Sequence, residues 1–298
     1  MRRFVILFLF GIHTISSLAQ ESNFFKPADT LNIKRRNAVI ISEASLATVS
    51  LIALDRLWYS DFERGSFKTV NDSGDWYGMD KFGHVFSSYQ LGRYGYNLLA
   101  WSGVRENDRL LYGATLGFTF LLAVELMDAY SSEWGFSWAD VASNALGTGL
   151  FVGQHLLWQE QRISLKFSFQ SSDFSDINPD QLGETFAENI FKDYNGQTYW
   201  LSFNMKSFLK DSFFPNWFNV AVGYGADGML NGSFEDPDLP IQNAYSQYYL
   251  SFDIDLTRIK TNSHFLKTLF DVFNFIKIPS PTLELTSRGN LKFHYIYF

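Results

Sequence analysis

The repeat of apolar residues changes its period near residue 160, and this change strongly limits what the chain can fold into. After it, every second residue is apolar in six segments, namely 163–169, 199–205, 218–224, 248–256, 283–285 and 291–297. This spacing predicts antiparallel strands with one apolar face. We therefore predict an α+β protein, with an N-terminal four-helix bundle over residues 37–159 and an antiparallel β-rich part over residues 160–298.

Four helices are predicted before the change, over 37–58, 81–101, 108–130 and 138–159. Ser137 is a suitable N-cap for the last of them. Within the β-rich part, residues 181–192 form a candidate short helix. Residues 264–276 carry apolar side chains at helical spacing, which is typical of an amphipathic helix. Glu43 and Arg93 could pair between the first two helices.

The N-terminus has the pattern of a secretory signal, with Arg2 and Arg3 before the apolar run 4–12 and small residues at Ser17 and Ala19. We predict a signal peptide over residues 1–19 and an irregular lead-in over 20–36. The chain has no cysteine. Disulfides, thiol nucleophiles, Cys-based zinc sites and lipidation through an N-terminal Cys are therefore excluded.

Composition points to the cell envelope. Aromatic residues make up 18% of the chain and charged residues also 18%, below the ~25% charged residues of an average globular protein. The β-rich part therefore resembles a small or incomplete outer-membrane-type barrel, although such barrels usually have at least about eight strands. A periplasmic β-sandwich and inner-membrane helices are the alternatives. The net charge of −7 and the absence of a basic run argue against nucleic-acid binding.

Three clusters of polar residues lie in or beside the apolar helical segments, where an unpaired charge is costly. Asp80, Lys81 and His84 begin the second helix. Further along the chain come Glu125 and Asp128 in the third helix, and Ser137, Asp140, Asn144 and Gly147 in the fourth. Spacings of three and four residues place the members of each cluster on one helix face. If the three helices are neighbours, these side chains converge, and Gly147 allows their backbones to approach closely.

A convergent cluster of this kind permits several chemistries. The candidate catalytic residues are His84, Asp80, Lys81, Glu125 and Asp140, with His84 as general base or metal ligand. His84, Glu125, Asp128 and Asp140 could also hold a divalent cation. Asp128, Ser137, Asn144 and Gly147 would complete a buried polar network. The same groups could instead form a satisfied structural network without a ligand, and the residues identify neither a metal nor a cofactor.

In their order and spacing, these motifs resemble the YfiM-like family of predicted periplasmic lipoproteins. Asp80-Lys81-x-x-His84, Glu125 and Asp140-x-x-x-Asn144-x-x-Gly147 are more distantly similar to VanZ-like membrane proteins. The resemblance covers about residues 37–158 and implies a small helical bundle in the cell envelope. Asp128 departs from the VanZ-like pattern, which has Gln and Arg after the Glu.

These observations lead to an expected function. We expect an exported protein of the periplasm or outer membrane, with a structural or ligand-binding role centred on the buried polar site. Its expected partners are a membrane lipid or another envelope component, including an envelope protein. The competing functions are an enzyme that modifies an envelope lipid or glycan through His84, and an accessory to a pore or transporter.

Overall fold

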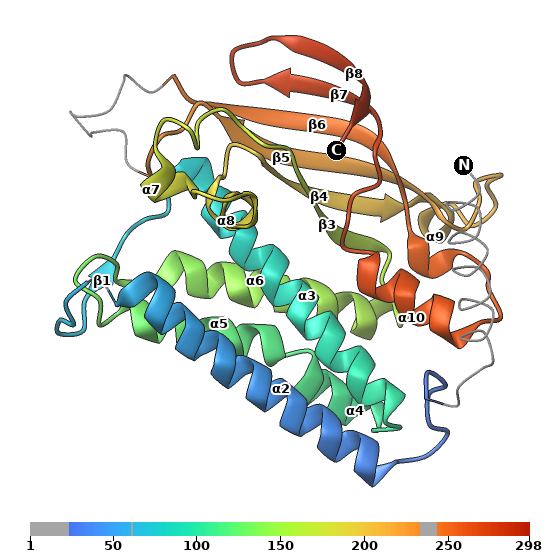
Figure 1. Cartoon of the computed structure of the whole chain (residues 1–298). Coiled ribbons are helices and arrows are strands. Elements are labelled where there is room, and N and C mark those ends of the chain that lie inside the picture. Colours follow the sequence, from blue (N-terminus) through green and yellow to red (C-terminus); the bar gives the residue numbers. More distant parts are fainter. Residues whose placement is uncertain (1–23, 61, 233–242) are drawn as a thin grey trace, which may run out of the picture.

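The computed structural model describes residues 24–60, 62–232 and 243–298. Helices and a sheet form two layers that contact each other (Figure 1). The predicted signal peptide over residues 1–19 lies outside the described residues.

The helical layer is built around α3 (Met79–Trp101), which packs against α5 (Leu116–Asp128) and α6 (Trp138–Trp158). A three-residue helix α4 (Glu106–Asp108) and a π-helical turn (Arg109–Gly113) precede α5. A Cβ atom at Gly117 or Gly147 would overlap backbone carbonyl oxygens of α3. Glycine at these two positions therefore lets α5 and α6 lie close against α3.

The first predicted helix begins earlier and packs less than expected. It is α2 (Ile33–Leu54), capped by Asn32, and it continues into a π-helical turn over Asp55–Tyr59. Val39 is its only buried residue, so the predicted four-helix bundle is not confirmed, and α3, α5 and α6 form the packed group. Within the described part of the chain, two helical stretches are long and apolar enough to cross a membrane, Ile33–Leu54 and Glu106–Asp128.

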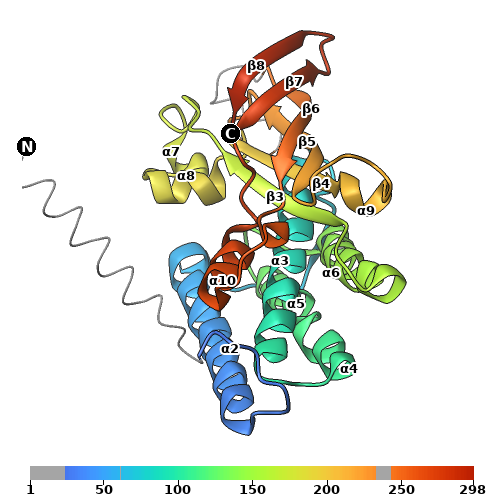
Figure 2. The same ribbon diagram turned by 90° about the vertical axis from the view of Figure 1, so that its right-hand side faces the viewer.

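The six predicted strands are confirmed as one antiparallel sheet in sequence order. They are β3 (Ile163–Phe169), β4 (Gln197–Asn204), β5 (Phe218–Asp227), β6 (Tyr245–Ile254), β7 (Ser280–Thr286) and β8 (Leu291–Tyr297). The sheet is open, with β3 and β8 at its edges. Figure 2 shows β7 and β8 at the end of the sheet that is farthest from the helices.

Smaller elements complete the fold. The predicted short helix is divided into α7 (Pro179–Leu182) and α8 (Phe186–Lys192), and the amphipathic helix is α10 (His264–Phe273). A further short helix, α9 (Met205–Phe208), follows β4. Two-residue strands β1 (Thr69–Val70) and β2 (Phe136–Ser137) pair in parallel and tie the loop before α3 to the start of α6. The alternation of apolar residues gave no signal for β1 and β2 because they are too short.

The sheet has a polar buried face and an apolar exposed face. Lys166, Ser202, Asn219 and Thr282 on the inner face are at most 1% exposed. On the opposite face, a row of apolar side chains that face one another in register crosses five strands, namely Leu201, Val222, Leu250, Leu283 and Phe293. They are 38–52% exposed. We call this row the apolar outer face. This distribution is the reverse of a water-soluble sheet and is typical of strands that face lipid.

The sheet curls around its polar face, so that strands distant in the sheet touch. The hydroxyl of Tyr297 in β8 lies 3.0 Å from that of Thr198 in β4. Lys166 in β3 forms an ion pair of 2.8 Å with Asp253 in β6. Ser202 donates a hydrogen bond of 2.6 Å to the same carboxylate. The buried charges are therefore satisfied within the curl, as burial in a low dielectric requires.

Helix α3 covers only one end of the apolar side of the sheet. Phe86 packs on Phe167 and Tyr199, with ring centroids 5.7 and 5.8 Å apart, and Phe82 stacks on Tyr224 at 4.7 Å. The possible pair of Glu43 with Arg93 is not formed. Arg93 instead pairs with Asp271 of α10 at 2.6 Å, and it thereby joins α3 to the β-rich part.

Candidate functional site

Lys81 lies at the centre of the polar cluster. Its Nζ is 2.8 Å from carboxylate oxygens of Asp72 and Asp80 and 2.7 Å from Oδ1 of Asp140. Burial lowers the pKa of Lys81, but these three carboxylates outweigh it and the net pKa is raised. Lys81 is therefore a permanent cation that holds the start of α3, the start of α6 and the loop before α3 together.

His84 lies one turn further along α3 and faces the same carboxylates. Its Nε2 is 3.6 Å from Oδ1 of Asp80 and 3.7 Å from Oδ1 of Asp140, while its Nδ1 is 3.1 Å from Oδ1 of Asn144. Burial lowers the pKa of His84, and the nearby carboxylates and Asn144 raise it, with a net increase. The surroundings therefore favour the imidazolium form, in which both ring nitrogens donate hydrogen bonds.

Local structure positions each of these groups. Ser137 caps α6 and accepts a hydrogen bond of 3.1 Å from the backbone N–H of Asp140, and its hydroxyl donates to Asp72 at 2.6 Å. Gly147 brings the backbone of α6 against α3 near Val85. As a result, Asp140 and Asn144 meet His84. We call Asp72, Asp80, Lys81, His84 and Asp140 the polar centre.

Glu125 and Asp128 lie behind the polar centre. Glu125 is 1% exposed and is 3.9 Å from Nδ1 of His84, and it accepts a hydrogen bond from the backbone N–H of Ser137. Burial raises its pKa to about 8. Burial also raises the pKa of Asp128 to about 6, and that residue accepts a hydrogen bond of 2.6 Å from Tyr59. Glu125 is therefore largely protonated at neutral pH.

Glu125 should make the protein less stable as the pH rises. Its carboxyl has an ordinary pKa of 4.5 in the unfolded chain and a pKa of about 8 in the folded protein. Between these values the folded state binds the proton that the unfolded state has lost, so the free energy of unfolding falls with increasing pH. We expect Glu125→Gln to remove this part of the pH dependence in denaturant unfolding.

The exposed variant Glu133→Gln is the matched control, and it should keep the wild-type pH profile. If Glu125→Gln and the wild type show the same slope between pH 4.5 and 8, the buried carboxyl is not the group that titrates.

Three residues of the site offer ligand atoms for a cation. These atoms, from Asp80, His84 and Asp140, lie within 4.8 Å of one another. Glu125 and Asp128, which the sequence also pointed to, are not part of this group. The ammonium of Lys81 already contacts both carboxylates, so it supplies positive charge at the position that a divalent cation would take.

The sequence did not identify two members of the site. Asp72 lies in the loop before α3, and Tyr194 comes from the β-rich part and donates a hydrogen bond of 3.1 Å to Asp80. Neither belongs to a periodic polar pattern. The polar run Asn71-Asp72-Ser73 was a visible signal for the loop, but only the three-dimensional structure brings Tyr194 to α3.

A cavity of about 530 Å³ adjoins the polar centre. Asp80, His84, Ser87, Tyr194 and Gln197 are polar residues of its lining, and Tyr194 donates a hydrogen bond to Asp80. The other lining residues are mainly apolar and come from α3, α5, α8, β3, β4 and the segment after α10, with Phe86, Leu121, Phe167, Ile190, Phe191, Tyr199 and Phe275 as the large ones. We call it the apolar cavity. Both the helical part and the β-rich part build it, so it depends on the contact between them.

The fold and the site together define a mixed helix-and-sheet protein with a buried acid–imidazole cluster beside an apolar cavity. Residues 64–154 match the model of a family described as predicted periplasmic lipoprotein (DUF2279). This segment contains every residue of the polar centre. The match fits the predicted YfiM-like resemblance and supports an envelope-associated protein located in the periplasm or at the outer membrane. The VanZ-like resemblance stays a prediction. Searches of curated proteins and of solved structures gave no match.

Proposed function

We propose that the protein is a binding protein of the cell envelope that holds an amphipathic, lipid-like ligand in the apolar cavity. The observation that carries this proposal is the composition of the cavity wall. Aromatic and aliphatic side chains suit an acyl chain, while Asp80 and His84 at one part of the wall suit a polar head. Its volume of about 530 Å³ lies within the usual ~300–1,000 Å³ of ligand pockets.

The charges of the polar centre select the kind of head group. Its three carboxylates, Asp72, Asp80 and Asp140, face two cationic groups, Lys81 and His84. One negative charge is therefore left over when all five are ionised. A head group with hydroxyl or amine donors would be attracted, and an anionic head group would be repelled.

A titration with monoacylglycerol that carries a fluorescent chain tests the binding. We expect saturable binding to the wild type and about tenfold weaker binding to Leu121→Trp, because the larger side chain fills part of the cavity. Leu126→Trp is the control, since Leu126 lies on the same helix and is 48% exposed. The corresponding fatty acid, whose head is anionic, should bind more weakly. Equal affinity of both tryptophan variants would contradict the proposal.

The sheet supports an association with the outer membrane. The apolar outer face leaves Val222, Leu250, Leu283 and Phe293 at 42–52% exposure, and contiguous apolar surface of this kind marks contact with lipid or protein. A small or incomplete barrel-like sheet that lies against lipid would remove these side chains from water. The same face could also serve an envelope protein partner or a transport accessory role.

Flotation with vesicles of phosphatidylethanolamine and phosphatidylglycerol tests this association. Leu250 and Leu283 face each other in register, so the double change Leu250→Glu and Leu283→Lys adds a cross-strand ion pair that spares the fold. We expect the wild type to float and the double variant to remain at the bottom. Ile177→Glu changes an exposed apolar residue outside the sheet and should float normally. Flotation of the double variant would show that the apolar outer face is not the surface that binds the membrane.

A catalytic role is the second candidate, and it is favoured by the position of His84 in the cavity wall. Because the carboxylates favour its imidazolium form, His84 is better suited to donate a proton than to remove one. An enzyme that modifies an envelope lipid would then lose turnover in His84→Gln and keep its acyl-chain binding. Unchanged turnover of envelope lipid extracts in this variant would contradict the catalytic role.

A further inference from the structure

The loop that joins α9 to β5 presents apolar side chains to solvent. Phe213 is 90% exposed, more than any other large apolar side chain in the described part of the chain, and Phe208, Leu209 and Trp217 are 40–49% exposed. Contiguous apolar surface of this kind marks a site of contact with lipid or protein. We call residues 208–217 the aromatic loop.

The rings of the aromatic loop are held in place by contacts with one another. Phe213 packs on Phe214 with ring centroids 4.6 Å apart, and Phe214 stacks on Phe218 at 5.2 Å with the ring planes 7° apart. The Nζ of Lys206 donates a hydrogen bond of 2.6 Å to the carbonyl oxygen of Ser212. Because the rings are already ordered, binding through them costs little conformational entropy.

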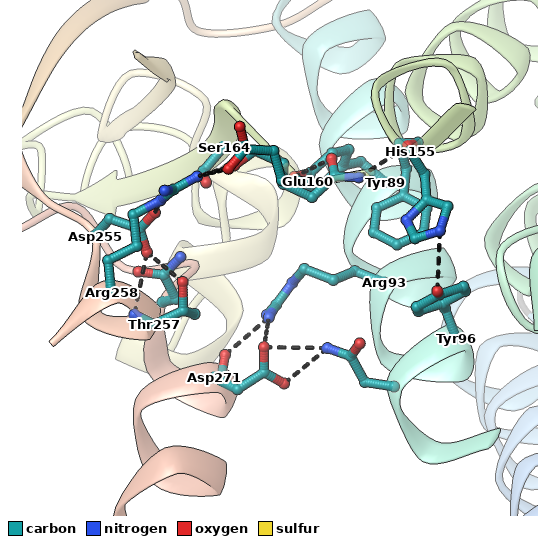
Figure 3. Close-up of a pocket in the computed structure, with 14 residues that line it drawn as sticks. Tyr89, Arg93, Tyr96, His155, Glu160, Ser164, Asp255, Thr257, Arg258 and Asp271 are labelled. Carbon is teal, nitrogen blue, oxygen red and sulfur yellow. Dashed lines mark hydrogen bonds and ion pairs between the residues drawn. The ribbon is translucent and has the colours of Figure 1, made fainter. Parts of the chain in front are cut away.

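The base of the aromatic loop is fixed to the segment that follows β6. The backbone N–H of Asp255 donates a hydrogen bond of 2.9 Å to the carbonyl oxygen of Trp217. The carboxylate of Asp255 forms an ion pair of 3.1 Å with Arg258, which also pairs with Glu160 at 3.2 Å (Figure 3). Hydrogen bonds and ion pairs therefore hold the base from which the exposed rings project.

The aromatic loop is continuous with the apolar outer face. Phe218 packs on Phe252 of β6 with ring centroids 5.6 Å apart, and Phe252 is 52% exposed. Phe252 is two residues from Leu250, so both side chains lie on the same face of the sheet. One apolar surface therefore runs from the apolar outer face to the end of the sheet where β4 ends and β5 begins.

Charged residues beside the rings indicate how deep the aromatic loop would lie in a bilayer. Lys210 and Asp211 are exposed and come just before Phe213 in the chain. Charged side chains are costly at the centre of a bilayer, whereas aromatic rings are enriched at the level of the head groups. Charges of both signs beside exposed rings therefore fit the boundary between hydrocarbon and phospholipid head groups.

We propose that the aromatic loop is an interfacial anchor, which inserts Phe213 and Trp217 among phospholipid head groups where the apolar outer face enters the bilayer. This inference rests on the membrane association proposed above for the sheet. It adds that the end of the sheet formed by α9 and the start of β5 lies at the bilayer surface.

Fluorescence at a single introduced cysteine tests the anchor, because the chain has no cysteine of its own. Phe213→Cys carries an environment-sensitive fluorophore, and vesicles of phosphatidylethanolamine and phosphatidylglycerol are added. We expect the emission to shift to the blue, and to be quenched more strongly by a nitroxide on the lipid head group than by one at the chain end. Ile177→Cys is the matched control, because Ile177 is exposed outside the sheet, and it should show neither effect.

Phe213→Ser should bind these vesicles about tenfold more weakly than the wild type, because one exposed ring no longer leaves water. Ile177→Ser should bind as the wild type does. Monoacylglycerol binding in the apolar cavity should be the same in all three proteins, so this result is separate from the function of that cavity.

A wild type that floats while the label at residue 213 shows no shift would overturn the anchor and leave the association of the sheet intact. Stronger quenching from the chain end would place the aromatic loop inside the hydrocarbon and would also overturn it. So would equal vesicle binding by Phe213→Ser and the wild type. A wild type that does not float would overturn both the anchor and the association of the sheet.

Discussion

Asp253→Ala should lower the free energy of unfolding by about 3–5 kcal/mol, as expected when one partner of a buried ion pair is removed. Asp253 lies 2.8 Å from Lys166 and 4.0 Å from Lys277, and both lysine side chains are completely buried. Burial already lowers the pKa of Lys277 to about 8. Without Asp253, two ammonium groups would remain inside the curled sheet with no ion-pair partner among the described residues. Chemical denaturation at neutral pH measures the change.

Two further variants show whether unpaired buried charge causes the loss of stability in Asp253→Ala. Asp176 is exposed in the segment after β3, and Asp176→Ala should leave stability unchanged. Replacing all three buried groups, as Lys166→Met, Asp253→Leu and Lys277→Met, should recover most of the loss, because buried ion pairs can often be replaced by apolar side chains. If Asp253→Ala is as stable as Asp176→Ala, the sheet does not depend on this cluster.

Lys81→Met should also lower the free energy of unfolding by about 3–5 kcal/mol near pH 8, because it removes the cation that three carboxylates share. Burial raises the pKa of Asp140 to about 6 even with Lys81 present, and losing the ammonium would raise it further. Protonation of Asp140 would then relieve its repulsion with the carboxylates of Asp72 and Asp80. The difference in stability between the variant and the wild type should therefore shrink as the pH is lowered below 6.

The exposed residue Lys34 on α2 provides the control, and Lys34→Met should match the wild type at every pH. Denaturant unfolding of the wild type, Lys81→Met and Lys34→Met from pH 8 to below pH 6 shows whether the charge of Lys81 or the packing of its side chain stabilises the site. A loss in Lys81→Met that is the same at all pH values would mean that packing of the lysine side chain, and not its charge, stabilises the site.

The strands could be predicted from the sequence because each alternates over several residues, and all six are found. The alternation could not show which face of the sheet is buried. An apolar Leu250 next to a polar Ser251 gives the same sequence pattern whether the apolar side faces a protein core or lipid. The structure resolves this: Ser251 is buried and Leu250 is 49% exposed. The loose packing of α2 could not be predicted from the sequence either, because the composition of α2 resembles that of a core helix.

The polar centre could be predicted in part. Asp80, Lys81 and His84 share one helix, and their spacing placed them on one face. Their meeting with Asp140 and Asn144 depended on the helices being neighbours, which the glycine contacts of α6 with α3 bring about. The contribution of Tyr194 could not be predicted, because it lies 114 residues from Asp80 in the chain and reaches the site only through the packing of the sheet on α3.

The most direct test of the proposed function is photo-crosslinking with a monoacylglycerol that carries a diazirine near the end of its chain, followed by mass spectrometry of the labelled peptides. The proposal predicts labels on the apolar walls of the cavity, at Leu121 of α5, Phe167 of β3 or Phe191 of α8, and it predicts that Leu121→Trp reduces them. Labels confined to the apolar outer face, at Leu250 and Leu283, would show that the lipid only coats the sheet and would contradict a ligand held beside Asp80 and His84.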